Sequence, residues 1–198
     1  MKNRILKIYP QSQFKSSAKE IIHIADFSQR TDQKYGVEMH ETKPQVPGKQ
    51  EYMDCLTLKN TSAISLDFNI FHDNQFKATD QKDIEHCECC IFPTVNGEKT
   101  WITFIEIKDC KIKNISIYKD KVKEQIIATV KQFIQHKIIQ KQRIYGVVSF
   151  PRKKVAFDDT IFQDYNEYKR LYKTEKIHFI ASNEIEVIDD QTIGLSGM

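Results

Sequence analysis

The sequence contains the pattern Glu-x-Lys three times, and one copy stands where its charges could do chemistry. The copies are Glu41-Thr42-Lys43, Glu106-Ile107-Lys108 and Glu167-Tyr168-Lys169. The first falls in a predicted loop and the third on the charged face of a predicted helix, so both are interpreted as solvated surface charges. The middle copy ends an apolar segment, where a carboxylate and an ammonium need a partner or a metal ion.

Residues 101–108 alternate in a way that predicts a strand buried on both faces. Ile102 and Phe104 form one row, and Trp101, Ile105 and Ile107 form the other. Because side chains in a strand alternate with period two, Glu106 and Lys108 project to the same side and continue the first row. The pair is either a site for chemistry or an ion pair that closes the core at the end of the strand.

The elements around this pair are predicted from short-range signals. Segment 86–92 is a second strand, and Asn96-Gly97 between the two is the strongest short signal for an antiparallel hairpin. Residues 121–139 place their apolar side chains on one face, which predicts a helix. Segment 143–150 is rich in β-branched and aromatic residues and stops at Pro151, so the strand, helix and strand form a β-α-β unit.

This order of elements resembles the PD-(D/E)XK nuclease superfamily over residues 84–150. The matching residues are Glu88 on the first strand, Glu106 and Lys108 on the second, and Gln125 on the helix. Glu88 stands where the family usually has Asp, and Glu20 is a candidate for the upstream helical Glu of many members. The resemblance implies an α/β fold with a restriction-endonuclease-like core, a mixed central sheet flanked by helices, in one domain spanning 1–198.

The resemblance also implies a chemistry. Glu88 and Glu106, helped by the main-chain carbonyl of Ile107, would hold Mg²⁺ or Mn²⁺ beside a scissile phosphate. Lys108 would orient the attacking water or offset charge on the phosphoryl oxygens, with Gln125 as an auxiliary. From sequence alone, Gln125 is as well explained as a polar residue on the solvent face of the helix. The implied activity is hydrolysis of nucleic acid, DNA rather than RNA, in genome defence or repair.

A site shared by Glu88 and Glu106 requires the hairpin to pair in a register that puts both side chains on one face of the sheet. A strict two-residue Asn96-Gly97 turn pairs Glu88 with Ile105, which turns it away from Glu106. Because a one-residue slip exchanges the faces, we predict irregular pairing between residues 92 and 101, with Pro93 as its natural place.

An unbroken ladder from the Asn-Gly turn predicts a different site. Glu85 would then lie on the face of Glu106 and Lys108 and replace Glu88 as the first acidic ligand. With neither Glu85 nor Asp83 nearby, and Glu88 distant from Glu106, a shared metal ion would be excluded.

The five cysteines have two interpretations. They are Cys55, Cys87, Cys89, Cys90 and Cys110. Cys-x-Cys-Cys in a strand divides its thiols between two faces, whereas a zinc site usually has two separated knuckles. We therefore predict buried, metal-free thiols, with zinc as the alternative.

Composition and charge allow a nucleic-acid partner without requiring one. The chain has 198 residues and a net charge of +3, too mild to predict such binding unless the cations cluster. Lysines 111, 113, 119, 121 and 123, and the run Arg152-Lys153-Lys154, could follow a phosphate backbone. With no signal peptide or long apolar run, we expect a cytoplasmic protein without membrane association.

The remaining segments complete the prediction. Residues 14–25 have apolar side chains at helical spacing, 28–51 is expected to be a long surface loop, and 64–70 alternates as a half-buried strand. A second amphipathic helix is predicted at 157–172, and a closing hairpin at 177–188. The competing function is a catalytically silent nuclease-fold module that binds nucleic acid or a protein partner, and a homodimer is also possible.

Overall fold

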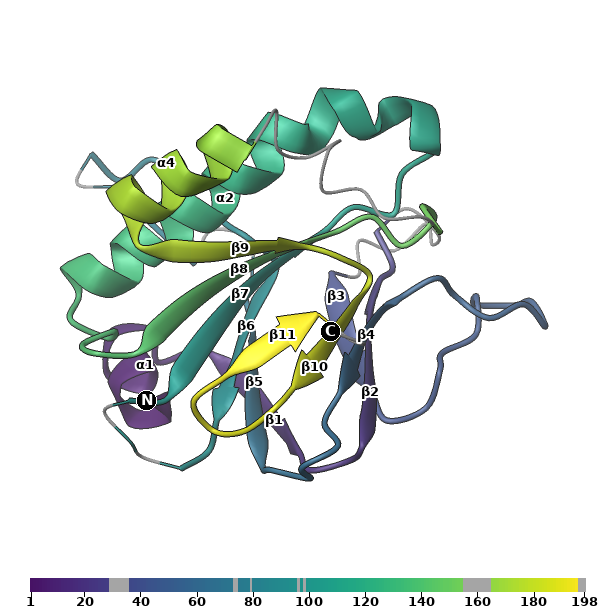
Figure 1. Cartoon of the computed structure of the whole chain (residues 1–198), viewed down its shortest axis with the longest axis horizontal. Coiled ribbons are helices and arrows are strands. Elements are labelled where there is room, and N and C mark those ends of the chain that lie inside the picture. Colours follow the sequence, from purple (N-terminus) through teal and green to yellow (C-terminus); the bar gives the residue numbers. More distant parts are fainter. Residues whose placement is uncertain are drawn as a thin grey trace.

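Two β-sheets packed face to face form the framework of the protein (Figure 1). The computed structural model describes residues 1–28, 36–72, 75–78, 80–95, 97, 99–154 and 165–195. The larger sheet has the order β1-β5-β6-β7-β8-β9, made of β1 (Gln13–Ser17), β5 (Leu66–Ile70), β6 (Cys89–Pro93), β7 (Trp101–Ile107), β8 (Arg143–Ser149) and β9 (Ile177–Ala181). Its strands are antiparallel from β1 to β7 and parallel from β7 to β9.

The predicted β-α-β unit is confirmed. From β7 the chain passes through a short 3-10 turn, η1 (Ile112–Asn114), and the long helix α2 (Ile115–Gln135) before it returns as β8, parallel to β7. The helix starts and ends earlier than the predicted 121–139. Its buried side chains include Val122, Ile126, Val130 and Phe133, four of those that the spacing predicted to face inward.

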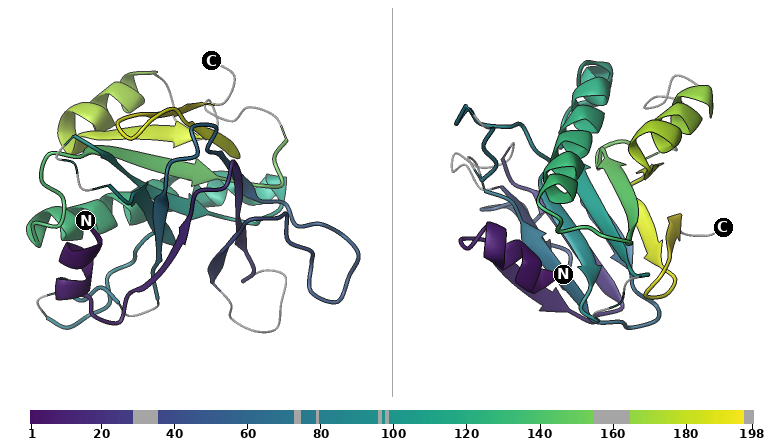
Figure 2. Two further views of the ribbon diagram at one scale, coloured as in Figure 1. Left: turned by 90° about the horizontal axis from the view of Figure 1, so that it is seen from below. Right: turned by 90° about the vertical axis from the view of Figure 1, so that its left-hand side faces the viewer.

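The helices cover one face of the larger sheet. Side chains of α1 (Lys2–Ile8), α2 and α4 (Tyr165–Glu175) pack with Phe104, Val148 and their neighbours in one apolar cluster. Figure 2 shows α2 and α4 side by side above the strands. Ile102 and Phe104 of β7 belong to this helix-side core, as the alternation of the strand predicts.

The other face of the larger sheet is covered by a second sheet, which the sequence did not predict. Its order is β11-β10-β4-β2-β3, made of β11 (Ile193–Leu195), β10 (Glu184–Val187), β4 (Leu56–Lys59), β2 (Ile21–Asp26) and β3 (Val37–His40). Trp101, Ile105 and Ile107 pack against it. Mixed α/β structure is thus confirmed, but a sheet, and not helices, covers this second face of the described structure.

The predicted helix at 14–25 is wrong, because these residues form β1 and β2. Ile22 and Ile24 alternate into the sheet–sheet core, so the period-two pattern of this β-branched run prevailed over the helical spacing. The expected surface loop at 28–51 is also only partly a loop, since it contains β3, whose Val37 and Met39 are buried.

The predicted closing hairpin at 177–188 is wrong as well, because its two halves join different sheets. β9 lies beside β8, whereas β10 pairs in parallel with β4. Asn183 fixes the link between β9 and β10, where the chain passes from one sheet to the other. Its side-chain amide donates to the carbonyls of Phe150 (2.9 Å) and Lys153 (2.6 Å), and its Oδ1 accepts from the Ser149 hydroxyl.

The second predicted helix is confirmed in part. It appears as α4 at Tyr165–Glu175, and residues 155–164 lie outside the described residues. The predicted strand at 64–70 is confirmed as β5. None of the helices in the described ranges is long and apolar enough to cross a membrane.

Candidate active site at the ends of β6 and β7

Glu106 is a fully buried carboxylate near the end of β7. Neighbouring strands enclose β7 on both sides, so the side chain has no exposed surface. Its Oε1 lies 2.6 Å from the Nζ of Lys108. Its Oε2 has no hydrogen-bond partner among the described residues. Burying such an oxygen without a donor is costly, so this atom is available to a ligand.

The predicted irregularity in the hairpin is confirmed. Cys89 pairs with Ile105 and Ile91 with Thr103, one residue away from the register of a strict Asn96-Gly97 turn. A second irregularity lies beside the site, where the N–H of Glu88 also donates to the carbonyl of Ile105 (3.1 Å). Glu88 and Cys89 therefore both lie opposite Ile105, the two-against-one arrangement of a β-bulge.

Although Glu88 lies opposite Ile105 in the ladder, its carboxylate reaches the same ammonium as Glu106. Its Oε1 lies 3.5 Å from the Nζ of Lys108, and the side chain is about a quarter exposed. The carboxylate oxygens of Glu88 and Glu106 that face Lys108 cannot be further apart than the sum of their distances to Nζ, about 6 Å. The structure therefore brings together the three charged residues that the sequence singled out.

Gln125 and Thr129 of α2 hold the chain that leads into the bulge. The side-chain amide of Gln125 donates to the carbonyl of His86 (3.0 Å), and the hydroxyl of Thr129 accepts from the N–H of Cys87 (2.9 Å). Gln125 is buried, so its interpretation as a solvent-facing residue is wrong. Its Oε1 has no hydrogen-bond partner in the described part of the chain.

Burial and charge act in opposite directions on the acidic groups. Burial raises the pKa of Glu106 to about 8, although the nearby Lys108 ammonium lowers it. Burial likewise raises the pKa of Glu88 above its usual value, again against Lys108. For Lys108, burial disfavours the charge, but the attraction of Glu106 and then Glu88 outweighs it and raises the pKa above its ordinary value. The lysine is therefore charged, whereas the carboxylates are costly to ionise without a further cation.

Asp26 is a third acidic residue at the site, and the sequence analysis missed it. It ends β2 in the second sheet and is almost fully buried. Its Oδ2 is 3.5 Å from the N–H of Asp109, just beyond Lys108, and its Oδ1 accepts from the N–H of Ser28. No local signal could have found it, because the link depends on packing between two sheets.

A cleft of about 650 Å³ opens beside Lys108. Its lining includes Asp26 and Asp109 and the cations Lys108, Lys111, Lys113, Lys121 and Arg152. Arg152 forms a two-pronged pair with Asp109, and Lys121 lies 3.0 Å from Glu85. Lys111 and Lys113 have no ion pair within the described ranges. The cleft is therefore positive next to the buried carboxylates, an arrangement that favours a phosphate group.

The alternative acidic residues lie elsewhere. Glu85 is largely exposed beside Lys121, and Asp83 is exposed beside Lys77. Glu20 precedes β2 at the end opposite to Asp26, exposed in a turn and not on a helix. Of the other two Glu-x-Lys copies, Glu41 is exposed, whereas Glu167 lies 2.7 Å from Lys123 and is mostly buried.

The Cys-x-Cys-Cys thiols are divided between two layers. Cys87 and Cys90 lie in the helix-side core and Cys89 in the sheet–sheet core, and all three are buried. The bulge explains why residues 87 and 90 share a side. Cys89 therefore cannot share a zinc ion with Cys87 and Cys90, and the burial of all three thiols fits a role in packing.

Glu88, Glu106 and the main-chain carbonyl of Ile107 can hold a magnesium or manganese ion only if water or substrate supplies the remaining ligands. In the described ranges no group of three or more His, Cys, Asp or Glu side chains is arranged to hold a metal. Mg²⁺ commonly uses one or two carboxylates with waters and substrate phosphates, at about 2.1 Å from each oxygen. Direct binding by both Glu88 and Glu106 therefore requires their oxygens within about 4.2 Å of each other, a separation that the upper limit of about 6 Å allows. The free Oε2 of Glu106 supports such a fit.

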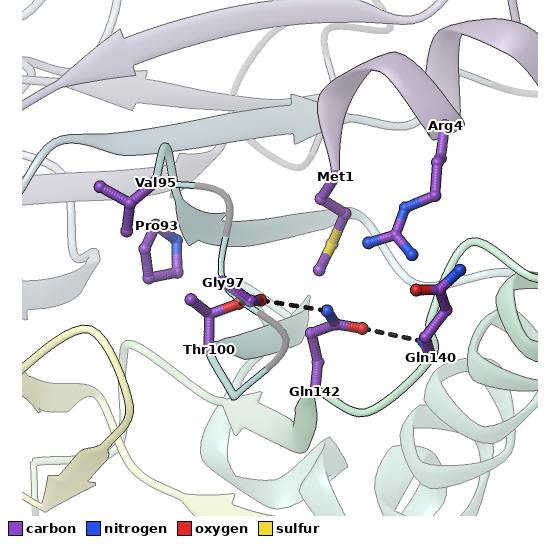
Figure 3. A pocket seen from close by; sticks show the side chains of 8 residues that line it. All are labelled: Met1, Arg4, Pro93, Val95, Gly97, Thr100, Gln140 and Gln142. Carbon is purple, nitrogen blue, oxygen red and sulfur yellow. Dashed lines mark hydrogen bonds between the residues drawn. The ribbon is translucent and has the colours of Figure 1, made fainter.

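A smaller cavity of about 180 Å³ lies near the beginnings of β7 and β8, where α1 meets the β6–β7 connection (Figure 3). The Gln142 side chain there donates to the carbonyl of Gly97 (3.4 Å) and accepts from the N–H of Gln140 (2.8 Å). These bonds of Gln142 fix the chain at the cavity wall. No carboxylate or histidine lines the cavity. The cavity is therefore a poorer candidate for catalysis than the cleft beside Lys108.

Comparison of the chain with protein-family models, curated proteins and solved structures finds no match.

Proposed function

We propose that this protein is a divalent-metal-dependent nuclease that hydrolyses phosphodiester bonds, with DNA preferred to RNA. The observation that carries the proposal is the buried Glu106 carboxylate, whose second oxygen lacks a hydrogen-bond partner among the described residues. The position of the Glu88 carboxylate beside the same lysine supports it. The proposal includes a role in genome defence or repair, because the motif resembles that of the PD-(D/E)XK nuclease superfamily.

Glu88, Glu106 and the main-chain carbonyl of Ile107 are the groups that would hold Mg²⁺ or Mn²⁺, which when bound polarises the phosphate and lowers the pKa of a bound water. Lys108 now neutralises the two carboxylates, and it would be free of that role if they held a cation. Lys108 lines the cleft, so it can then stabilise charge developing on the phosphoryl oxygens.

Gln125 supplies an acceptor on the helix side of the site. Its amide nitrogen is fixed by His86, which leaves Oε1 to accept a hydrogen bond from the attacking water. Asp26 holds the turn after β7 through the N–H of Asp109, and so fixes the chain on which Lys108 stands.

A catalytically silent module is the second candidate, and one observation favours it. Lys108 already lies between the two carboxylates, so the three charges can serve as an ion-pair cluster that closes the core. Such a module would bind nucleic acid or a protein partner through the positive cleft without cleaving a bond.

The test is incubation with supercoiled plasmid, single-stranded DNA and RNA, with Mn²⁺, with Mg²⁺ and with EDTA. We expect metal-dependent nicking by the wild type and none by Lys108→Ala. Circular dichroism should show that the variant is folded, because Glu106 can take up a proton when its partner is removed. If the wild type neither cleaves nor binds either metal, the silent-module proposal replaces this one.

Lys123 offers a matched control for Lys108. It is also a buried lysine on α2, and it lies 2.7 Å from Glu167 of α4 and 3.0 Å from Asp120 of α2. Lys123→Ala should disturb stability in a similar way and leave nicking intact. Equal loss of nicking in both variants would show that the effect of Lys108→Ala comes from damaged folding.

A further inference from the structure

Arg152 lies on a turn after β8 whose main chain is fixed at both ends. The N–H of Lys153 donates to the carbonyl of Phe150 (2.8 Å), which closes the turn. Pro151, which precedes Arg152, restricts the backbone within it. The side-chain amide of Asn183 donates to the carbonyls at both ends of the turn. The main chain that carries Arg152 is therefore ordered before any ligand binds.

The guanidinium of Arg152 is held by a buried carboxylate. Its Nε donates to Oδ1 of Asp109, and its Nη2 donates to Oδ2 at 3.0 Å. Asp109 is 2% exposed, and its own N–H lies 3.5 Å from the Oδ2 of Asp26. Because a guanidinium is a rigid plane, two bonds along one edge fix the direction of the whole group.

A second edge of the same guanidinium is left for a ligand. The group has five N–H bonds, and the pair with Asp109 uses the Nε–Nη2 edge. The Nη1 of Arg152 has no partner among the described residues. The side chain is 28% exposed and lines the cleft, so the unused N–H groups are the part left to face it. Two N–H groups in one plane match two oxygens of a phosphate.

The presence of Asp109 in the cleft is not explained by attraction of an anion. The lining also includes Lys108, Lys111 and Lys113, and a carboxylate among these lysines reduces the positive charge that an anion would meet. What Asp109 contributes is the orientation of Arg152. A cation whose direction is fixed in advance loses less conformational freedom when it binds a phosphate.

We propose that Arg152 is a phosphate clamp, oriented by Asp109, for a nucleic-acid phosphate next to the scissile one. Lys108 pairs with Glu106 and Glu88. Arg152 pairs with a different carboxylate, so we assign the two cations to different phosphates. The cleft, of about 650 Å³, has room for more than one. The inference rests on the proposed function and adds a binding residue that needs no metal.

The first experiment measures binding in EDTA, so that it does not depend on cleavage. Fluorescein-labelled DNA is presented as a single strand and as a duplex, and affinity is read by anisotropy over a series of salt concentrations. R152Q should bind about tenfold more weakly and lower the salt slope by about 0.7 for the single strand and about 0.9 for the duplex. An unchanged slope, or no DNA binding by the wild type, would overturn the clamp.

R152K tests whether the shape of the guanidinium matters. Lysine keeps the charge without the planar pair of donors, so R152K should keep the salt slope and regain only part of the affinity. Affinity equal to that of the wild type would show that charge alone is used, and the clamp would be overturned.

D109N distinguishes orientation from simple electrostatics. The substitution removes a negative charge from the cleft, so charge alone predicts tighter DNA binding. The clamp predicts weaker binding, because an amide has only one acceptor oxygen for the two donors of Arg152. Tighter binding by D109N would overturn the orienting role of Asp109. Thermal unfolding followed by circular dichroism establishes that each variant is folded at the assay temperature.

Arg143 provides the matched control. It is an exposed arginine at the start of β8, the opposite end of the strand from Arg152, and its Nη1 lies 3.5 Å from the Gln191 carbonyl. R143Q makes the same change of charge and should keep the wild-type affinity and salt slope. Equal losses in R143Q and R152Q would reflect net charge alone and would overturn the clamp.

Cleavage in Mn²⁺ separates the clamp from the nuclease. If Arg152 holds a neighbouring phosphate, R152Q should raise KM and leave kcat nearly unchanged. A fall in kcat at unchanged KM would overturn that placement. Binding in EDTA that depends on Arg152, without cleavage by the wild type, would support the clamp and sink the proposed nuclease. Cleavage by R152Q with the wild-type KM and salt slope would support the nuclease and sink the clamp.

Discussion

The hydroxyl of Thr129 accepts a hydrogen bond from the main-chain N–H of Cys87 at 2.9 Å, which ties α2 to the residue before Glu88. The same hydroxyl donates to the carbonyl of Gln125 within the helix. One buried side chain on α2 therefore fixes the start of the bulge that contains Glu88.

Thr129→Val should disturb both stability and the site. Valine keeps the shape but leaves the buried N–H of Cys87 without an acceptor, so the free energy of unfolding should fall by about 1–3 kcal/mol. Nicking should fall further than the loss of folded protein explains, because Glu88 is no longer held. Urea unfolding and a nicking assay at a temperature where the variant is fully folded measure the two effects.

Thr103→Val is the control for that substitution. Thr103 is equally buried, but its hydroxyl has no hydrogen-bond partner among the described residues. Removing it should leave stability unchanged or raise it by about 1 kcal/mol. Similar losses in both variants would mean that Thr129 acts through packing and not through its bond to Cys87.

Glu106→Gln should separate stability from activity. The substitution removes a buried charge whose ionisation burial opposes, and Lys108 keeps Glu88 as a partner. Metal-free stability should therefore stay within about 1 kcal/mol of the wild type or increase, while Mn²⁺ binding and nicking are lost. Calorimetric titration with Mn²⁺ checks the binding, and undiminished affinity would remove Glu106 from the metal site.

Tyr9→Phe should change how stability depends on pH. Tyr9 is buried against Phe76 and Phe133, its hydroxyl has no partner among the described residues, and burial raises its pKa to about 12. The folded state therefore favours the neutral phenol. The stability of the fold is unaffected by Tyr9 ionisation below the pKa of tyrosine in the unfolded chain, near 10, and falls as the pH rises from there toward 12.

The wild type should thus lose stability relative to Tyr9→Phe above pH 10, and the two should run parallel below it. Denaturant unfolding of both proteins between pH 7 and about 11 measures the difference, in which the shared titration of lysines cancels. A constant difference across this range would contradict the raised pKa.

Asn183→Ala should loosen the contact between the sheets. The substitution removes the bonds to the carbonyls of Phe150 and Lys153 and to the Ser149 hydroxyl at the point where the chain crosses. Because the residue is partly exposed, a loss of about 1–3 kcal/mol is expected. Hydrogen exchange should show the change first at Thr57, whose N–H donates to the Asn183 carbonyl.

The core of the candidate site was predictable because its signals are local. Alternation placed Glu106 on the helix side, the Asn-Gly turn marked the hairpin, and one apolar face marked α2. The need for irregular pairing followed from counting residues back from the turn, although the second irregularity at Glu88 did not.

The second sheet was not predictable in the same way. Its strands come from both ends of the chain, and β4 pairs with β10 across more than a hundred residues. Short segments such as β2 carry helix-like and strand-like spacing together, and only the partner strand decides between them. Asp26 was missed for this reason, since it reaches the site from the end of β2.

The pairing of β6 with β7 also makes the length of their connection matter. The connection lies at the opposite end of these strands from Glu106, in a surface position where insertions are usually harmless. A change of one residue that shifted the register would exchange the faces of β6 and turn Cys90 out of the helix-side core. Loss of the bulge in the same step would restore the facing only of the residues before Cys89. Length variants of this protein should therefore tolerate changes in steps of two.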